Sequence, residues 1–152
     1  QLKPSIMLFD EPTTGLDPQA RRNFWDLVQS IRAAGATILL TTHYMDEAQV
    51  LCDEVAIMDG GQIVTQGSPE ALLQKQYDGL IIELPISDLT DSLPGIEHTV
   101  HENLGIIEVI TTDVSKSLQQ LTPHVSDLNQ IKIRQPNLED LFLDLTGHSL
   151  RA

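Results

Sequence analysis

Two short apolar segments with one amphipathic helical pattern between them constrain the fold of this chain more than any other feature. Ser5–Phe9 and Ala36–Thr42 are brief and apolar, the second also β-branched, which is typical of strands buried on both faces. Pro18–Ala34, which lies between them, has apolar side chains at helical spacing: Phe24, Leu27, Val28 and Ile31. A strand, a long helical crossover and a second strand predict two parallel neighbours in a sheet covered by helices, that is, an α/β fold.

Shorter elements complete the first half of the chain. They are a helix at 45–51, the strands of a hairpin at 54–59 and 62–66, and a helix that begins at Ser68-Pro69 and reaches Gln76. Acidic residues become more frequent after Asp78-Gly79. We therefore expect two units, residues 1–77 and residues 78–152.

The second unit alternates strand and helix patterns in a recognisable order. Strands are predicted at 80–84, 96–102, 106–111 and 128–134, a short helix or turn at 87–93, and helices at 114–121 and 138–145. This β-α-β-β-α-β order is the outline of a small ferredoxin-like α+β domain with one further helix. Asn137 is the expected N-cap of that last helix, and Gly147 ends it.

The composition excludes several classes of function. The chain has 22 acidic residues against 9 lysines and arginines, a net charge of −13, so it lacks the basic stripe that nucleic-acid binding requires. No apolar run approaches the roughly 20 residues that cross a bilayer, and the first residues do not have the order of a signal peptide. The one cysteine, Cys52, forms no internal disulfide and is expected to be a small buried apolar group.

The candidate chemistry lies where the two predicted strands end. Asp10 and Glu11 follow the first strand, and His43 follows the second. The carboxyl ends of parallel strands meet at one edge of a sheet, which is where open α/β sheets bind ligands. One carboxylate there can hold a magnesium ion, its neighbour can polarise a water molecule, and a histidine can donate to a terminal phosphate.

The order of these motifs resembles the nucleotide-binding subunit of ABC transporters from the middle of its ATPase domain onward. The matching segments are residues 6–12 (Walker B with its catalytic glutamate), 15–17 (D-loop), 42–43 (switch histidine), 45–48, 53–58, 60–63 and 67–69. They cover nearly all of residues 1–77. The resemblance implies the C-terminal part of a P-loop NTPase, with a mostly parallel sheet and flanking helices.

The resemblance also implies a role for each candidate residue. Asp10 would act on Mg²⁺ and Glu11 would be the general base on the hydrolytic water, with ATP as the nucleotide. His43 would contact the γ-phosphate, and Asp17 would communicate across the interface with a second ATPase subunit. The implied partners are that subunit and a membrane permease, at the cytoplasmic face of the membrane, with no nucleic acid.

The C-terminal residues resemble the extension of ATPases that serve ABC-2-type exporters. The resemblance rests on residues 136–143 and 145–147. It implies a subunit that powers export and an accessory or regulatory role for residues 78–152.

Two features of the family are missing from the chain. It contains neither the Gly-x-x-x-x-Gly-Lys-Ser/Thr loop that cradles phosphates nor the family's Ser-Gly-Gly-Gln signature. Both precede Walker B in the family, and the chain opens on Gln1, so we expect a piece of a longer ATPase that is inactive alone. The alternatives are a non-catalytic regulatory or dimerisation fragment and a soluble ATPase of the superfamily without a permease.

Overall fold

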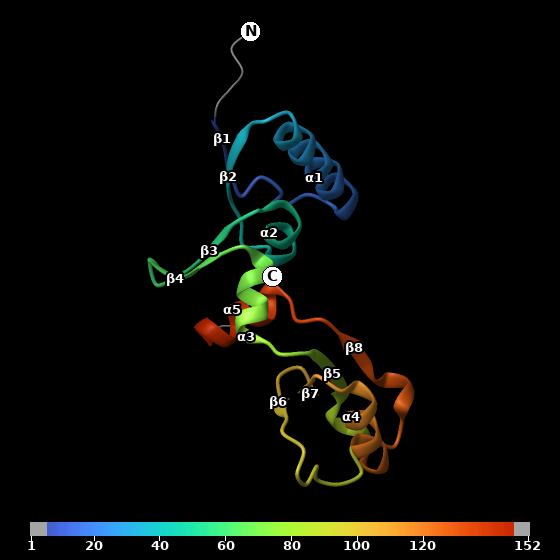
Figure 1. The fold of residues 1–152 in the computed structure, drawn as a ribbon. Coiled ribbons are helices and arrows are strands. Elements are labelled where there is room, and N and C mark those ends of the chain that lie inside the picture. Colours follow the sequence, from blue (N-terminus) through green and yellow to red (C-terminus); the bar gives the residue numbers. More distant parts are fainter. Residues whose placement is uncertain (1–5, 148–152) are drawn as a thin grey trace. The chain divides into compact units, whose positions relative to one another are not determined.

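The chain divides into two units, and the division differs from the expected one. The computed structural model describes residues 6–147 (Figure 1). One unit comprises Gln1–Ala71 together with Asn137–Ala152, and the other comprises Leu72–Pro136. The expected second unit ran to residue 152, but its last helix groups with the first unit.

The first unit begins with the predicted strand, helix and strand. These elements are β1 (Ile6–Asp10), α1 (Pro18–Ala33) and β2 (Thr37–Thr41). The two strands are parallel and paired in register from Ile6 with Thr37 to Asp10 with Thr41, as predicted. α1 packs on this pair, because the ring of Phe24 meets that of Phe9 edge to face at 5.5 Å.

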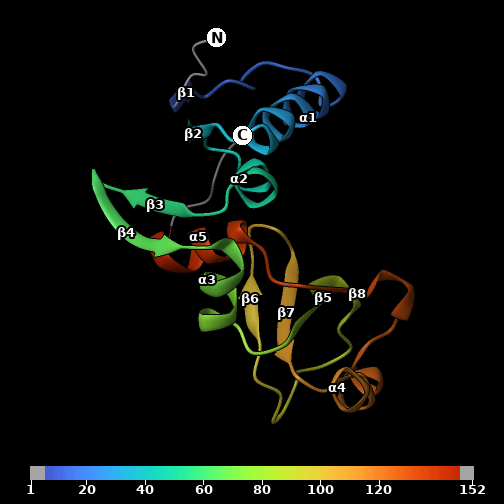
Figure 2. The same cartoon turned by 45° about the horizontal axis from the view of Figure 1, so that its top comes forward.

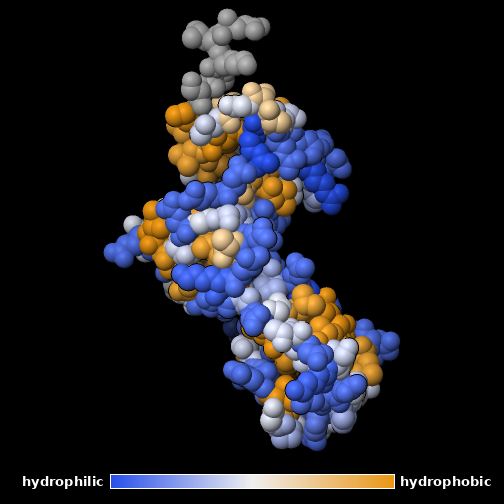
Figure 3. Space-filling model, viewed as in Figure 1, coloured by the Kyte–Doolittle hydropathy of each residue, from blue (hydrophilic) through white to orange (hydrophobic). Residues whose placement is uncertain are grey.

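Burial of the two strands is one-sided, which corrects the expectation of strands buried on both faces. Alternate side chains are partly covered, whereas Ile6, Leu8 and Leu39 are 64%, 72% and 62% exposed. Figure 3 shows hydrophobic side chains gathered at this part of the first unit. Within residues 6–147, α1 covers one face of the strand pair and the other face stays open.

Four further elements follow α1 and its strands. They are α2 (Met45–Leu51), the antiparallel hairpin of β3 (Val55–Asp59) and β4 (Gln62–Gly67), and α3 (Pro69–Gln76), within which the division between the units falls. The hairpin turns at Gly60 and Gly61, which both have positive φ, a conformation that glycine adopts without strain.

The last helix, α5 (Leu138–Thr146), packs on α2. Asn137 and Asp140 form a capping box at its start, as the sequence predicts for an N-cap. The backbone N–H of Leu138 donates to Gln49 Oε1 of α2 at 2.9 Å. Leu138 and Leu141 are buried, so α5 contributes apolar side chains to the first unit.

The second unit is a four-stranded antiparallel sheet. Its elements are β5 (Leu80–Pro85), η1 (Ile86–Asp88), β6 (Thr99–His101), β7 (Ile106–Thr111), α4 (Val114–Leu121), η2 (Thr122–His124), η3 (Leu128–Gln130) and β8 (Lys132–Arg134). The strand order is β6-β7-β5-β8 (Figure 2). This is a ferredoxin-like arrangement in which the first crossover holds only the short 3₁₀ turn η1 in place of a helix.

One face of this sheet packs the core of the second unit, and the other carries a charged network. The buried members of the core are Ile82, Leu84, Leu93, Ile107, Val109, Leu121 and Val125. On the other face Arg134 lies between two carboxylates, with Nη2 2.7 Å from Glu108 Oε1 and Nε 3.2 Å from Glu83 Oε2. Because Glu83, Glu108 and Arg134 belong to β5, β7 and β8, the network joins three strands.

Candidate functional site

The candidate site begins at the paired ends of β1 and β2. Asp10 and Thr41 are the last residues of the two strands and are register partners. The Thr41 hydroxyl donates to Asp10 Oδ1. The backbone N–H of Glu11 donates to the Thr41 carbonyl oxygen at 2.9 Å, and Thr41 Oγ1 lies 3.1 Å from the same nitrogen. Thr41 therefore fixes the positions of both acidic residues.

Glu11 has an unusual backbone conformation. Its φ is +44°, and no other non-glycine residue within 6–147 has a positive φ. Such a conformation costs on the order of 1–3 kcal/mol and persists only where the surroundings hold it. Here the two contacts of the Glu11 N–H with Thr41 hold the residue, and the backbone N–H of Thr14 donates to its carbonyl at 3.2 Å.

The structure brings Glu11 and His43 together. Glu11 Oε2 lies 3.3 Å from His43 Nδ1 and accepts a hydrogen bond from the Thr14 hydroxyl at 3.4 Å. The two side chains are 50% and 41% exposed, so a ligand in solution can reach both. The expectation that Asp10, Glu11 and His43 share one edge of the sheet agrees with this arrangement.

Asp17, the fourth candidate, has a local structural task. It is the N-cap of α1, and its Oδ1 accepts from the backbone N–H of Ala20 at 2.9 Å. A side-chain acceptor at this position satisfies one of the unpaired N–H groups of the first helical turn.

A buried polar cluster behind the acidic loop was not found by sequence reasoning. Glu47 of α2 is fully buried, and its Oε1 accepts from Thr13 Oγ1 at 2.8 Å and from Trp25 Nε1 at 2.9 Å. The sequence pattern assigned no role to Glu47. One signal was present, because Glu47 lies four residues before Leu51 and so shares the apolar face of its helix.

Arg21 ties α1 to α2 beside this cluster. Its Nη2 donates to both carboxylate oxygens of Asp46, at 3.1 and 3.2 Å. The guanidinium also lies 4.4 Å from the ring centre of Tyr44 and 5.3 Å from that of Trp25. These contacts fix the start of α2, directly after His43.

The residues present fit Mg²⁺ only as part of a larger ligand set. Within residues 6–147 no three His, Cys, Asp or Glu residues are grouped as a metal site would require. Mg²⁺ commonly takes one or two carboxylates and completes its shell with phosphates and water. Asp10, at the strand end, can supply such a single carboxylate.

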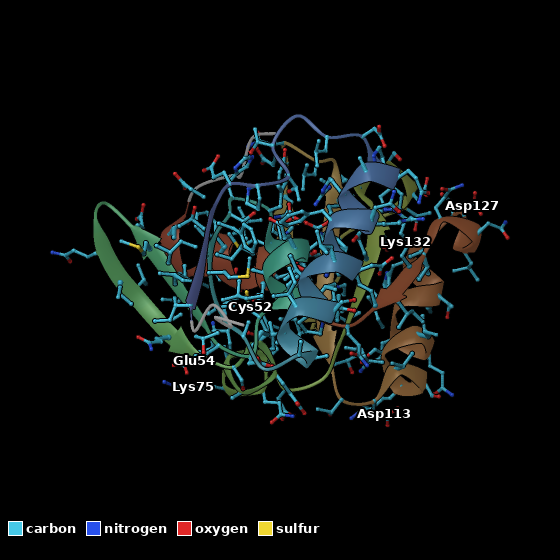
Figure 4. All side chains as sticks on the ribbon, turned by 90° about the horizontal axis from the view of Figure 1, so that it is seen from above. Cys52, Glu54, Lys75, Asp113, Asp127 and Lys132 are labelled. Carbon is cyan, nitrogen blue, oxygen red and sulfur yellow. The ribbon has the colours of Figure 1, made fainter. Side chains whose placement is uncertain are left out.

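Cys52 is a partly buried thiol, not the fully buried group expected from the sequence. Burial raises its pKa above the usual 9.0, and the negative charges of Glu47 and Asp53 raise it further, while Arg32 lowers it. Figure 4 labels its side chain, which follows the end of α2. These effects disfavour the thiolate, which is the reactive form of cysteine.

None of the helices within residues 6–147 has the length and apolar character needed to span a membrane.

Comparison with known proteins finds similarity to one family profile and to a solved structure. A family profile described as "AAA domain, putative AbiEii toxin, Type IV TA system" matches residues 1–45. A solved structure titled "Structure of ATP binding subunit of ABC transporter" is 31% identical, with a TM-score of 0.44, and the match covers 49% of this chain and 31% of that one.

Two relatives match almost the whole chain. The linearmycin resistance ATP-binding protein LnrL of Bacillus subtilis strain 168 is 34% identical over 161 residues, which cover 98% of this chain and 52% of the relative. The Nod factor export ATP-binding protein I of Rhizobium leguminosarum bv. viciae is 37% identical over 154 residues, covering 97% and 48%. Over nearly its whole length the chain is homologous to ABC transporter ATP-binding proteins.

The match to these ABC ATP-binding proteins extends beyond the ATPase motifs. It includes both units of the fold, because the aligned part is 97% or more of the chain. The chain spans about half the length of the curated relatives it matches.

Proposed function

We propose that this chain supplies the water-activating part of an ATP hydrolysis site in the ATP-binding subunit of an ABC exporter. The observation that carries the proposal is the 3.3 Å contact between Glu11 and His43 at the ends of two parallel strands. At this distance a base and a phosphate-contacting group can both reach a water molecule placed between the carboxylate and the γ-phosphate.

Each candidate residue has a distinct role in the proposal. Asp10 supplies a carboxylate to Mg²⁺, which neutralises charge on the phosphates when it is bound. Glu11 accepts the proton of the attacking water. His43 directs Nδ1 at Glu11, so a contact to the γ-phosphate uses Nε2. Asp17, beyond its capping bond, communicates with a second ATPase subunit.

The names of the relatives support export as the process. One relative is named for Nod factor export and another for linearmycin resistance. By analogy we infer that the complete protein forms a dimer, couples to a membrane permease and works at the cytoplasmic face of the membrane. Residues 72–136 then form an accessory unit with a regulatory or dimer-forming role.

The test is Glu11→Gln in the complete ATPase that contains this chain. The amide keeps the size of the side chain but accepts no proton from water. We expect turnover to fall about 10²–10⁴-fold, the usual scale for loss of a general base, with Mg-ATP binding retained. Phosphate release and equilibrium nucleotide binding measure the two effects separately.

Glu102→Gln is the matched control for this variant. Glu102 is an exposed acid in the turn between β6 and β7, and its removal should leave turnover unchanged. Turnover of the Glu11→Gln protein within a few-fold of the parent would contradict the role of Glu11 as base.

A second prediction concerns the 152-residue chain by itself. It has no phosphate-cradling loop and a net charge of −13, so a polyanion meets little that attracts it. We expect neither tight binding of Mg-ATP nor hydrolysis. Calorimetric titration is the measurement, and micromolar affinity would favour a complete site within these residues.

A further inference from the structure

We propose that Glu47 is a positioning residue that holds the loop after Glu11 in place relative to His43; this inference rests on the function proposed above. Glu47 contacts neither of the two reacting side chains. It acts through Thr13, which belongs to the loop between β1 and α1, and through its own helix, which begins directly after His43-Tyr44.

The connection is formed by two side chains that are almost completely shielded from water. Glu47 is 0% and Thr13 1% exposed, and the Thr13 hydroxyl donates to Glu47 Oε1 at 2.8 Å. Thr13 lies two residues after Glu11, and Glu47 lies four residues after His43. The loop of the base and the segment of the histidine are therefore joined by a buried hydrogen bond.

This buried bond is stronger than the direct contact it supports. Glu11 and His43 are about half exposed, and an exposed pair contributes little because water competes for both groups. A hydrogen bond to a carboxylate in a low-dielectric interior is both shorter and stronger than one between neutral groups. The position of Glu11 thus depends more on Thr13 and Glu47 than on His43.

Trp25 extends the connection to α1. Its indole N–H donates to the same oxygen, Glu47 Oε1, at 2.9 Å. The other oxygen, Oε2, is buried with no hydrogen-bond partner among the described residues. Burial of a carboxylate in this state is costly, and an apolar side chain would pack at lower cost. We therefore attribute the presence of an acid here to its positioning role. Through its Oε1, Glu47 of α2 holds both the loop of Thr13 and α1 in place.

Thr13→Val in the complete ATPase tests the proposal. Valine fills nearly the same volume as threonine but removes the hydroxyl, so the loop loses its bond to Glu47. We expect kcat to fall at least about tenfold, since displacements near 1 Å can cost 10²-fold, while KM for Mg-ATP changes little. Thr13→Ser, which keeps the hydroxyl, should restore most of kcat.

Thr111→Val is the matched control. Thr111 lies at the end of β7, where its hydroxyl accepts from the Asp113 N–H at 3.0 Å and from Ser117 Oγ at 2.7 Å. The same chemical change there should alter thermal stability but leave kcat unchanged. If both valine variants lower kcat in proportion to their loss of stability, Thr13 is merely structural and the proposal is wrong.

Glu47→Gln gives a second test that does not depend on Thr13. Its amide oxygen can still accept from Thr13 and Trp25, so kcat should stay within a few-fold of the parent, whereas Glu47→Ala should lower it as Thr13→Val does. If the parent is active and its Thr13→Val and Glu47→Ala variants keep the same kcat, the positioning role is wrong but the proposed function still holds. A parent that does not hydrolyse ATP overturns the proposed function as well.

Discussion

Acidic residues of one loop make different contacts because their local surroundings differ. Glu11 has a positive φ and directs its carboxylate at His43, whereas Asp17, six residues later, binds the backbone at the start of α1. A sequence motif names both residues but does not separate a solvent-facing carboxylate from one that caps a helix. That distinction comes from the hydrogen bonds each one makes.

The capping bond of Asp17 gives a prediction about stability. Asp17→Ala removes the acceptor for the Ala20 N–H and should lower the free energy of unfolding by about 1 kcal/mol. Asp17→Asn keeps a capping oxygen and should leave stability nearly unchanged. Urea unfolding of the 152-residue chain compares the two variants. Equal losses would show that the charge, and not the cap, matters.

The sequence predicted the exposed residues of the site but not the buried cluster of Thr13, Trp25 and Glu47 behind them. Asp10, Glu11 and His43 could be placed at one edge because strands of known direction bring their ends together. The contact of Thr13 with Glu47 joins residues 34 positions apart through the packing of a loop on a helix. No local periodicity specifies such packing, although an acid on the apolar face of α2 was a visible anomaly.

At the scale of elements, helices and inner strands were predicted more closely than edge strands. The sequence placed α2, β7 and α4 within the observed bounds. The strand predicted at 128–134 instead begins with η3, where Asp127 accepts from the Asn129 N–H at 2.9 Å, and only Lys132–Arg134 joins the sheet as β8. The local hydrogen bond of Asp127 favours the 3₁₀ turn η3, so residues 128–130 do not join the sheet.

Burial in the second unit also differs between the edge strands and the inner strands. Val100 and Ile133 are apolar residues of predicted strands, but they are 47% and 45% exposed. They belong to β6 and β8, the two edges of the sheet, where a neighbouring strand is present on one side only. Ile82 and Val109, on the inner strands, are buried. Apolar pattern alone does not show which strand is central.

The start of β5 leads to a prediction about a single glycine. A Cβ at Gly79 would lie 2.1 Å from the Thr111 carbonyl oxygen of β7, and its φ is +121°. We expect Gly79→Ala to cost about 3 kcal/mol, from strain together with overpacking. Chemical denaturation of the chain is the measurement.

Gly95→Ala is the control for this substitution. Its φ is also positive, at +76°, but no heavy atom lies within 4 Å of the added carbon. It should cost about 1 kcal/mol, from backbone strain alone. Equal losses at the two positions would show that the approach of β7 to Gly79 does not matter.

At the scale of the whole molecule, the second unit has the features of an independently folding domain. Leu72–Pro136 contains its own buried apolar cluster, a four-stranded sheet and the Arg134 network that joins three of its strands. Figure 4 shows Asp113 and Asp127 at the edge of the view. The sequence predicted its topology but extended it too far, because the apolar face of α5 does not reveal which core it joins.

Expression of residues 72–136 alone tests this independence. We expect a dispersed amide NMR spectrum, because the core cluster and all four strands are retained. A piece ending at residue 121 lacks β8 and is the control that should lose dispersion. A collapsed spectrum for residues 72–136 would mean that the unit needs the rest of the chain.

The packing of α5 on α2 changes how truncations of this chain are to be interpreted. A stop codon placed just before Asn137 would leave residues 72–136 whole and remove Leu138 and Leu141 of α5, which packs on the helix that follows His43. In a genetic screen, loss of these residues would therefore resemble a lesion of the Glu11–His43 site. A cleaner deletion of residues 72–136 is internal: it would join residue 71 to residue 137 through a short linker and keep α5.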